Sequence, residues 1–228
     1  SGAPREGIDF FPLMCDYRER FAAAGKFPGG FLKREGRPST KDTLTSRLTD
    51  RPIRPLFPKG FNDEVMCQST VVASDALNDG DVIAMNGIAA ALHISPLPFD
   101  GPIASVRVGR IDGQLVTFPT VEDLEESDLD MIVSGSLEEI LMIEGFAREM
   151  PEDEMVEAIL YAHEGIKLVC ELQNELHGKC DVQKQEFIAP EDDGIGAQLI
   201  EKYSEQFRAA RLTDGKQNRA EAVNVVKA

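Results

Sequence analysis

The sequence predicts an α+β fold, in which a mixed sheet packs with helices. Three observations support this prediction: strand-like apolar stretches near residues 65–74 and 103–118, helices with clear start signals, and a polar segment ahead of two short terminal helices. The 228 residues suit one medium-sized domain with an appendage. We expect a domain over residues 1–180, a linker over 181–194 and the beginning of an all-helical domain over 195–228.

The first predicted helix begins near Ser39. Residues 1–30, well before it, are rich in turn formers. Ser39 is a favourable N-cap residue, and Asp42 stands three residues later, which approximates a capping box. Pro52 and Pro55 are expected to end the helix, because proline lacks a backbone N–H and restricts the residue before it.

A strand and a second helix follow along the chain. Val65–Ser74 is a mostly apolar stretch with adjacent β-branched valines, which is typical of a strand. Residues 75–81 are expected to form a loop. Asp81–Ser95 is predicted to be helical, with an acid in its first turn and several alanines that allow close packing against a sheet.

Four more strands are predicted in two pairs. Ile103–Ile111 alternates apolar and other residues, and it is followed by Asp112-Gly113 and then Gln114–Phe118. Asp-Gly between two such stretches is a strong hairpin signal. Asp128–Ser134 and Ile140–Ile143 are expected to form another strand pair.

The last third of the sequence is predicted to be helical. Pro151 precedes a long helix with three acids in its first turn, a charge that favours a helix start. His163 lies on the apolar stripe of this helix, where a packed histidine is a better interpretation than a ligand. Beyond the polar linker, Ile195–Leu212 and Asn218–Lys227 have helical patterns, and two short helices cannot easily bury their own apolar faces.

Cysteine and histidine usage argues against a zinc site and against a disulfide framework. None of the four cysteines forms a Cys-x-x-Cys pair, and the three histidines are scattered. Few cysteines in a chain of this length are typical of reduced thiols in the cytoplasm. No apolar run reaches the roughly 18 residues that a membrane span needs, so we expect no membrane partner.

The charge distribution singles out one segment. The chain carries a net charge of −16, which taken alone argues against a nucleic-acid partner. Residues 26–59 nevertheless hold nine basic and only three acidic residues. A polyanion would be repelled everywhere except at this segment, although ion pairing within the protein could equally account for its arginines.

Several separated motifs, in the right order, resemble the first RNase-PH-like half of bacterial polynucleotide phosphorylases. The resemblance covers about residues 10–180. The motifs are Phe10–Leu13, Ala24–Ser39, Leu44–Pro58, Pro98–Ile103, Arg107–Gly109 and Asp128–Gly135. The linker and final helices resemble the start of the all-helical domain that follows in that family.

This resemblance implies a function. Members of the family are polyribonucleotide nucleotidyltransferases, which degrade RNA from its 3′ end with inorganic phosphate and require Mg²⁺. They form homotrimeric rings, and other RNA-decay proteins are further expected partners. The second half of such a chain holds the catalytic acids and the phosphate site, while the first half shapes the ring and helps to hold single-stranded RNA. Family members also carry strands ahead of Ser1, so we expect the N-terminal part of the domain to be truncated here.

Departures from the catalytic half predict that this half is inactive. By the resemblance, Asp81 takes the place of the phosphate-binding serine, in the turn that begins at Asn78. Asp130 matches one catalytic acid, but Ile132 replaces the lysine and Leu124 falls near the second acid. One acid without its partners is a poor site for magnesium and phosphate. We therefore predict no catalytic residue and no metal ligand in this chain.

The predicted RNA-binding residues are Phe31, Lys33, Arg34 and Arg37. In the family this loop contacts single-stranded RNA at the ring's pore. An aromatic ring can stack on an unpaired base while adjacent cations follow the phosphates. Leu32 cannot stack, and a lysine binds as a point charge instead of a fork. The alternative is a structural hairpin with a buried phenylalanine.

Other interpretations stay open at this point. Arg47, Arg51 and Arg54 suit an ion-paired scaffold at least as well as RNA contact. The acidic run of residues 122–130 is better explained as a solvated face than as a metal site, because it lacks the EF-hand spacing. The chain could also be a stand-alone RNA-binding or ring-scaffold protein without activity. A stand-alone exonuclease is a weaker alternative, since the phosphate serine and the lysine are missing.

Overall fold

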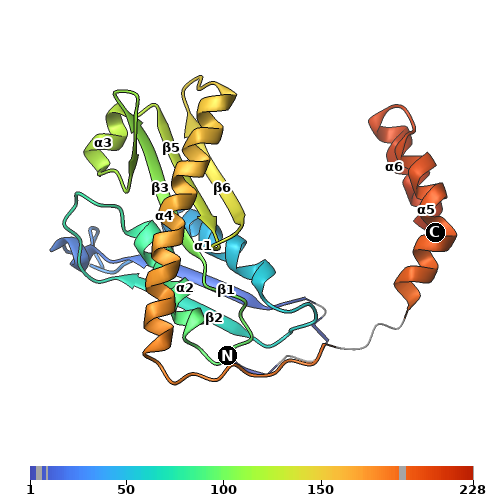
Figure 1. The fold of residues 1–228 in the computed structure, drawn as a ribbon, viewed down its shortest axis with the longest axis horizontal. Helices are drawn as coiled ribbons and strands as arrows, with labels where there is room; N and C mark the ends of the chain where they lie inside the picture. Colours follow the sequence, from blue (N-terminus) through green and yellow to red (C-terminus); the bar gives the residue numbers. More distant parts are fainter. Residues whose placement is uncertain (4–6, 9, 190–193, 228) are drawn as a thin grey trace. The chain divides into compact units, whose positions relative to one another are not determined.

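A computed structural model describes residues 1–3, 7–8, 10–189 and 194–227 and confirms the α+β class (Figure 1). The chain divides into two compact units, Ser1–Ile188 and Ala189–Ala228, which are described separately. In the first unit, two strands pair in parallel and four others form an antiparallel sheet. The mixed strand directions therefore come from two sheets and not from one continuous sheet.

The parallel pair consists of β1 (Leu13–Glu19) and β2 (Val65–Val71), in register from Leu13 opposite Val65 to Glu19 opposite Val71. The strand β1 was not predicted from the sequence, because three of its seven residues are charged and the surrounding segment is rich in turn formers. Pairing with β2 and burial of Leu13 and Tyr17 stabilise this strand. The predicted strand at 65–74 ends three residues early, at Val71.

The antiparallel sheet has the strand order β4-β3-β5-β6. Its strands are β3 (Ala104–Ile111), β4 (Gln114–Thr117), β5 (Leu129–Gly135) and β6 (Ile140–Ala147), so both predicted pairs are confirmed. Asp112 and Gly113 join β3 to β4 with positive φ angles of 49° and 76°, the geometry for which Asp-Gly is favoured in a tight hairpin.

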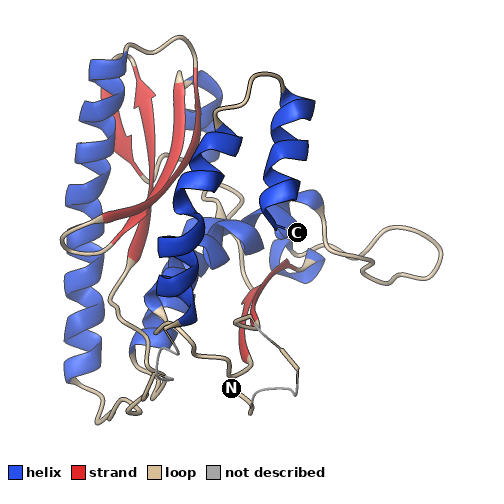
Figure 2. Ribbon diagram, turned by 90° about the vertical axis from the view of Figure 1, so that its right-hand side faces the viewer, coloured by secondary structure: helices blue, strands red, loops and turns tan. Residues whose placement is uncertain are grey.

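Helices cover both faces of this sheet. The long helix α4 (Glu152–Gly178) lies along one face, as Figure 2 shows, and its residues Ala158, Ala162 and Ile166 are fully buried there. Alternate β-strand residues point to opposite faces. Met131 and Val133 of β5 accordingly pack toward α4, whereas Ile132 packs with Val82 and Met85 of helix α2 (Gly80–His93).

The first helix, α1 (Thr40–Ile53), begins as predicted. The Ser39 hydroxyl accepts the Asp42 N–H at 3.0 Å, and the Asp42 carboxylate accepts the Ser39 N–H at 2.8 Å, so the capping box is confirmed. Pro52 does not end the helix but lies in its last turn. A 3₁₀ turn, η2 (Arg54–Leu56), then takes over, and Pro55 lies within it.

A second core lies between the parallel strands, α2 and the segments after α1. Three phenylalanines pack together in it: the Phe57 and Phe61 rings stack with centroids 5.4 Å apart, and the Phe99 ring is tilted against Phe57 at 5.5 Å. The His163 side chain is half-buried, with its Nε2 atom 3.1 Å from the Ser136 carbonyl oxygen, which agrees with a packed histidine.

Two short elements complete the first unit. The 3₁₀ turn η1 (Phe21–Ala24) follows β1, and helix α3 (Val121–Glu126) follows β4. The α3 helix was not predicted from the sequence, where residues 122–126 belong to a run expected to be a solvated acidic face. Thr120 and Asp123 form a second capping box there.

The second unit contains α5 (Ile195–Arg211) and α6 (Lys216–Lys227), close to the predicted ranges. None of the described helices is both long enough and apolar enough to span a membrane. Within the described residues, no group of three or more His, Cys, Asp or Glu side chains is arranged to hold a metal ion.

Candidate nucleic-acid interface

A fourteen-residue loop, residues 25–38, joins η1 to α1; we call it the cationic loop. It holds four basic residues and a single acid, Glu35. In Figure 1 it is part of the blue segment that projects beyond the end of β1. No strand or helix is present within it, so it is an open loop and not a hairpin.

All four predicted RNA-binding residues lie on this loop and are exposed. The Phe31 side chain is 99% exposed, which rules out its burial in a core of this chain. Lys33, Arg34 and Arg37 are also exposed, and no hydrogen bond or ion pair to any described residue engages their side chains. The structure therefore places one aromatic ring and three unpaired cations together in solvent.

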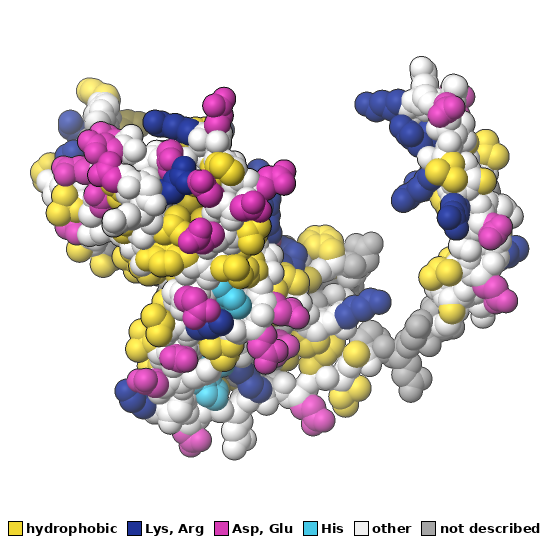
Figure 3. All heavy atoms as spheres, turned by 45° about the horizontal axis from the view of Figure 1, so that its top comes forward, with side chains coloured by type: hydrophobic (Ala, Val, Ile, Leu, Met, Phe, Trp, Pro, Cys, Tyr) yellow, Lys and Arg dark blue, Asp and Glu magenta, His cyan; other side chains and the backbone are white. Residues whose placement is uncertain are grey.

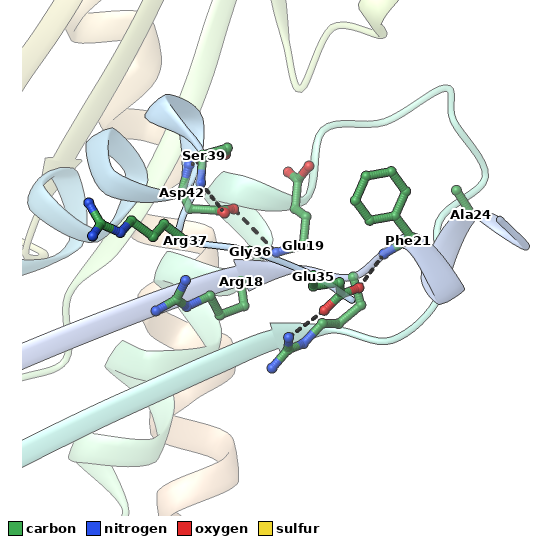
Figure 4. A pocket seen from close by; sticks show the side chains of 10 residues that line it. Arg18, Glu19, Phe21, Ala24, Glu35, Gly36, Arg37, Ser39 and Asp42 are labelled. Carbon is green, nitrogen blue, oxygen red and sulfur yellow. Dashed lines mark hydrogen bonds and ion pairs between the residues drawn. The ribbon is translucent and has the colours of Figure 1, made fainter. Parts of the chain in front are cut away.

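The two ends of the cationic loop are anchored at the same residue, Phe21. At the start of the loop, the Lys26 N–H donates to the Phe21 carbonyl at 3.0 Å. At its end, Glu35 Oε1 accepts the Phe21 N–H at 2.9 Å, while Glu35 Oε2 pairs with Arg20. Figure 4 shows the Glu35 side chain directed at this turn. The Arg20 contact and the Phe21 amide lower the pKa of Glu35 below its ordinary value.

A cavity of about 330 Å³ lies beneath this anchor (Figure 4). Arg37 contributes to its wall and has no ion pair among the described residues. Arg18, also in the wall, is held by Asp16 at 3.1 Å. The base of the cationic loop is thus hollow and bordered by both signs of charge.

Other arginines of the basic segment are engaged elsewhere. Arg51 pairs with Glu144 at 2.6 Å, and Arg54 pairs with Asp50 at 2.6 Å and donates to two backbone carbonyls of the β1 region. These ion pairs agree with the scaffold interpretation for Arg51 and Arg54. Arg47 lines a cavity beside both of them but makes no ion pair within the described residues.

A second cavity, of about 580 Å³, lies where α1, α2, α3, β3 and β5 meet; we call it the acidic pocket. It includes the positions that the resemblance aligned with phosphate binding and catalysis. The lining residues that carry charge are Lys41, Asp79, Asp81, Arg107, Glu125 and Asp130.

Arg107 is bound by three carboxylates in the acidic pocket. Its guanidinium lies 3.2 Å from Asp79, 2.9 Å from Asp81 and 3.3 Å from Asp130. Lys41 supplies a second cation, paired with Asp79 and, at 2.8 Å, with Glu19. Both cations of this pocket are therefore paired with carboxylates, whereas Glu125 makes no ion pair with a described residue.

The pKa values in the acidic pocket reflect burial and pairing together. Burial disfavours the charged form of Asp79, but Lys41 and Arg107 outweigh it and hold the pKa of Asp79 below its ordinary value. Burial dominates at Asp81, and its pKa is raised despite the attraction of Arg107. Burial also opposes the charge of Lys41, yet hydrogen bonds to Asp79 and Glu19 raise its pKa.

Asp81, Leu124 and Asp130, which the resemblance aligned with phosphate-binding and catalytic positions, line one pocket. Arg107 and Lys41 were given no role there from the sequence. A signal for Arg107 was available. It alternates with the fully buried Val106 and Val108, so it had to face the other side of the sheet, where α2 begins. It also lies directly opposite Ile132 on β5, the residue aligned with the missing lysine.

Comparison with known proteins identifies the family. Residues 1–98 match domain 1 of the 3′ exoribonuclease family, and residues 101–165 match domain 2. The chain belongs to the 3′ exoribonuclease family. It is 64% identical over 227 residues to a polyribonucleotide nucleotidyltransferase of Rhodopirellula baltica, with all of this chain and 30% of that relative covered.

Two further relatives carry the same name. The protein of Finegoldia magna is 44% identical over 228 residues, covering 100% of this chain and 32% of the relative. The protein of Geobacter sulfurreducens is 50% identical over 189 residues, covering 83% and 27%. The chain thus spans about a third of the length of the curated relatives it matches, and the family resemblance stated from the motifs is confirmed.

Proposed function

We propose that this chain is the first, RNA-holding half of a polyribonucleotide nucleotidyltransferase that degrades RNA from 3′ to 5′ with phosphate. The observation that carries the proposal is the cationic loop, in which Phe31, Lys33, Arg34 and Arg37 are exposed and free of partners. A stacking ring beside unpaired cations is the arrangement that binds single-stranded nucleic acid with little sequence preference.

The charge of the rest of the molecule supports this location. Acidic side chains spread widely over the body on the face shown in Figure 3, with basic ones scattered among them. Such a surface disfavours a polyanion, whereas the cationic loop, with four basic residues and one acid, offers it a favourable approach. RNA is therefore expected to engage the loop first.

The acidic pocket supports an inactive role for this half. Inorganic phosphate would meet Asp79 and Asp81, whose carboxylates already occupy the Arg107 guanidinium. Mg²⁺ does not fit either, because Asp130 is paired with the same arginine and Leu124 supplies no oxygen ligand. We assign the phosphate and Mg²⁺ that the family uses to the other half of the full-length enzyme.

The domain organisation and partners complete the proposal. We assign residues 1–180 to the first RNase-PH-like domain, 181–194 to a linker and 195–228 to the beginning of an all-helical domain. Single-stranded RNA is the proposed ligand, a homotrimer the proposed assembly and the cytoplasm the proposed location. The identity to polyribonucleotide nucleotidyltransferases over the whole chain supports these assignments.

One experiment tests both parts of the proposal. The 228-residue chain is mixed with end-labelled single-stranded RNA, phosphate and Mg²⁺, and RNA binding and nucleoside diphosphate release are followed together. We expect salt-sensitive binding without phosphorolysis. The variant K33A/R34A/R37A should bind RNA at least about tenfold more weakly. The slope of the logarithm of its affinity against the logarithm of the salt concentration should become shallower by about 2, because three potential phosphate contacts are removed.

Two results would overturn the proposal. Rapid release of nucleoside diphosphates would show that this half is catalytic. Unchanged affinity of the triple variant at low salt would remove the cationic loop from the RNA interface. The variant R51A is a matched control, since it removes a basic residue of the same segment that Glu144 already pairs.

A further inference from the structure

Glu35 is the one acid of the cationic loop, and it faces back toward the body. Its two carboxylate oxygens are divided between two anchors, the Phe21 N–H at 2.9 Å and the Arg20 guanidinium. Figure 4 shows this side chain lying between the loop and the turn after β1. An unpaired carboxylate in a loop that binds RNA would repel the phosphates, so the presence of an acid at this position requires a structural explanation.

Nothing else in the described structure closes this loop. No hydrogen bond and no ion pair joins residues 27–34 to a described residue outside this segment. The next anchor along the chain is the capping box at Ser39. Phe21 therefore holds both ends of the exposed segment, through its carbonyl to Lys26 and through its N–H to Glu35.

We propose that Glu35 is a positioning residue that fixes the cationic loop for single-stranded RNA; this inference rests on the proposed function. Tying the two ends together removes conformational freedom that RNA binding would otherwise have to remove. Pairing with Arg20 also neutralises the carboxylate, so that Lys33 and Arg34 act without a competing negative charge.

Removal of Glu35 should change the RNA affinity in the direction opposite to that expected from charge alone. Removal of an acid raises the net charge of the loop, so charge alone predicts tighter RNA binding in Glu35→Ala. Loss of the anchor predicts weaker binding, because the loop must then be ordered by the RNA itself. The sign of the change thus separates the two explanations.

The test measures the affinity of the full 228-residue chain for a single-stranded oligoribonucleotide by fluorescence anisotropy. We expect Glu35→Ala to weaken binding about three- to tenfold. Glu35→Gln should fall between this variant and the native protein, because its amide oxygen still accepts the Phe21 N–H. Glu122→Gln is the charge-matched control, since Glu122 is exposed on α3 outside the cationic loop, and its affinity should stay equal or rise slightly.

A double-mutant cycle adds a second readout. If Arg20 acts through Glu35, then Arg20→Ala/Glu35→Ala should bind no more weakly than the weaker single variant. Urea unfolding of Glu35→Ala should match that of the native chain, which separates loop positioning from a general loss of structure.

Each outcome decides a different claim. Equal or tighter binding by Glu35→Ala would overturn the positioning role, even if the triple cation variant still loses affinity. If the triple variant binds normally, the proposed function itself fails. Additive losses in the cycle would also reject the anchor, because two independent residues would then be acting.

Discussion

Replacement of Arg107 by alanine should destabilise the protein, and the loss should depend on pH. The Arg107 side chain is only 13% exposed, and Asp81 beside it is 5% exposed. Removing one partner of a buried ion pair costs about 3 to 5 kcal/mol, because the other charge stays buried and unpaired. Asp79 and Asp130 are reached by solvent, so we expect about 3 kcal/mol, at the low end of that range.

The pH dependence follows from Asp81. Its pKa is already raised by burial, and loss of Arg107 would raise it further. A carboxyl group with a raised folded-state pKa favours folding while it is protonated, and that stability is lost as the pH rises through the raised pKa. The loss of unfolding free energy in Arg107→Ala should therefore be largest near neutral pH and shrink toward about pH 5.

Urea unfolding followed by far-ultraviolet circular dichroism measures this difference, since the chain has no tryptophan. Arg107→Ala/Asp81→Asn should recover part of the loss at neutral pH, because the uncompensated carboxylate is gone while the amide oxygen can still accept the Val82 N–H. Two results would refute this account of the acidic pocket. One is an equal loss of unfolding free energy at neutral pH and at about pH 5, and the other is no recovery of stability when Asp81→Asn is added.

Two further predictions concern the loop tip and the core. Phe31→Ala should weaken single-stranded RNA binding by about 1 kcal/mol, the low end for loss of one stacked base. The free energy of unfolding should not change, because the ring is 99% exposed. A loss of stability would instead place Phe31 in the core. Ile166→Ala should cost about 3 kcal/mol of folding free energy, because this side chain is fully buried between α4 and the sheet. Chemical unfolding checks it, and a loss below about 1 kcal/mol would mean that the site collapses around the cavity.

Local signals predicted much of the fold. Asp112-Gly113 identified the hairpin and Ser39 with Asp42 identified the start of α1, because turn and cap chemistry depend on neighbouring residues alone. The strand β1 was not predicted, because its stability comes from pairing with a segment about fifty residues away. The α3 helix was not predicted, because its acidic residues indicated only a solvated face.

In the candidate sites, too, local features could be predicted from the sequence and long-range contacts could not. The exposed cations of the loop could be predicted from the local sequence, since exposure requires no partner. The partners of Arg107 could not, because they come from α2 and β5 and meet only in the folded chain. The contacts of Glu35 with Arg20 and Phe21 likewise could not be predicted, because these residues precede it by 15 and 14 positions in the chain.

The placement of β3 and β5 at the centre of their sheet has a consequence for the dynamics of the molecule. Each has a hydrogen-bonded strand on both sides, and helices shield both faces of the sheet. Their backbone amides should exchange with deuterium only when the first unit unfolds globally, whereas the amides of residues 27–34 should exchange almost as fast as in a free peptide. Slow and fast exchange would then distinguish the sheet from the proposed RNA-binding loop in a single experiment.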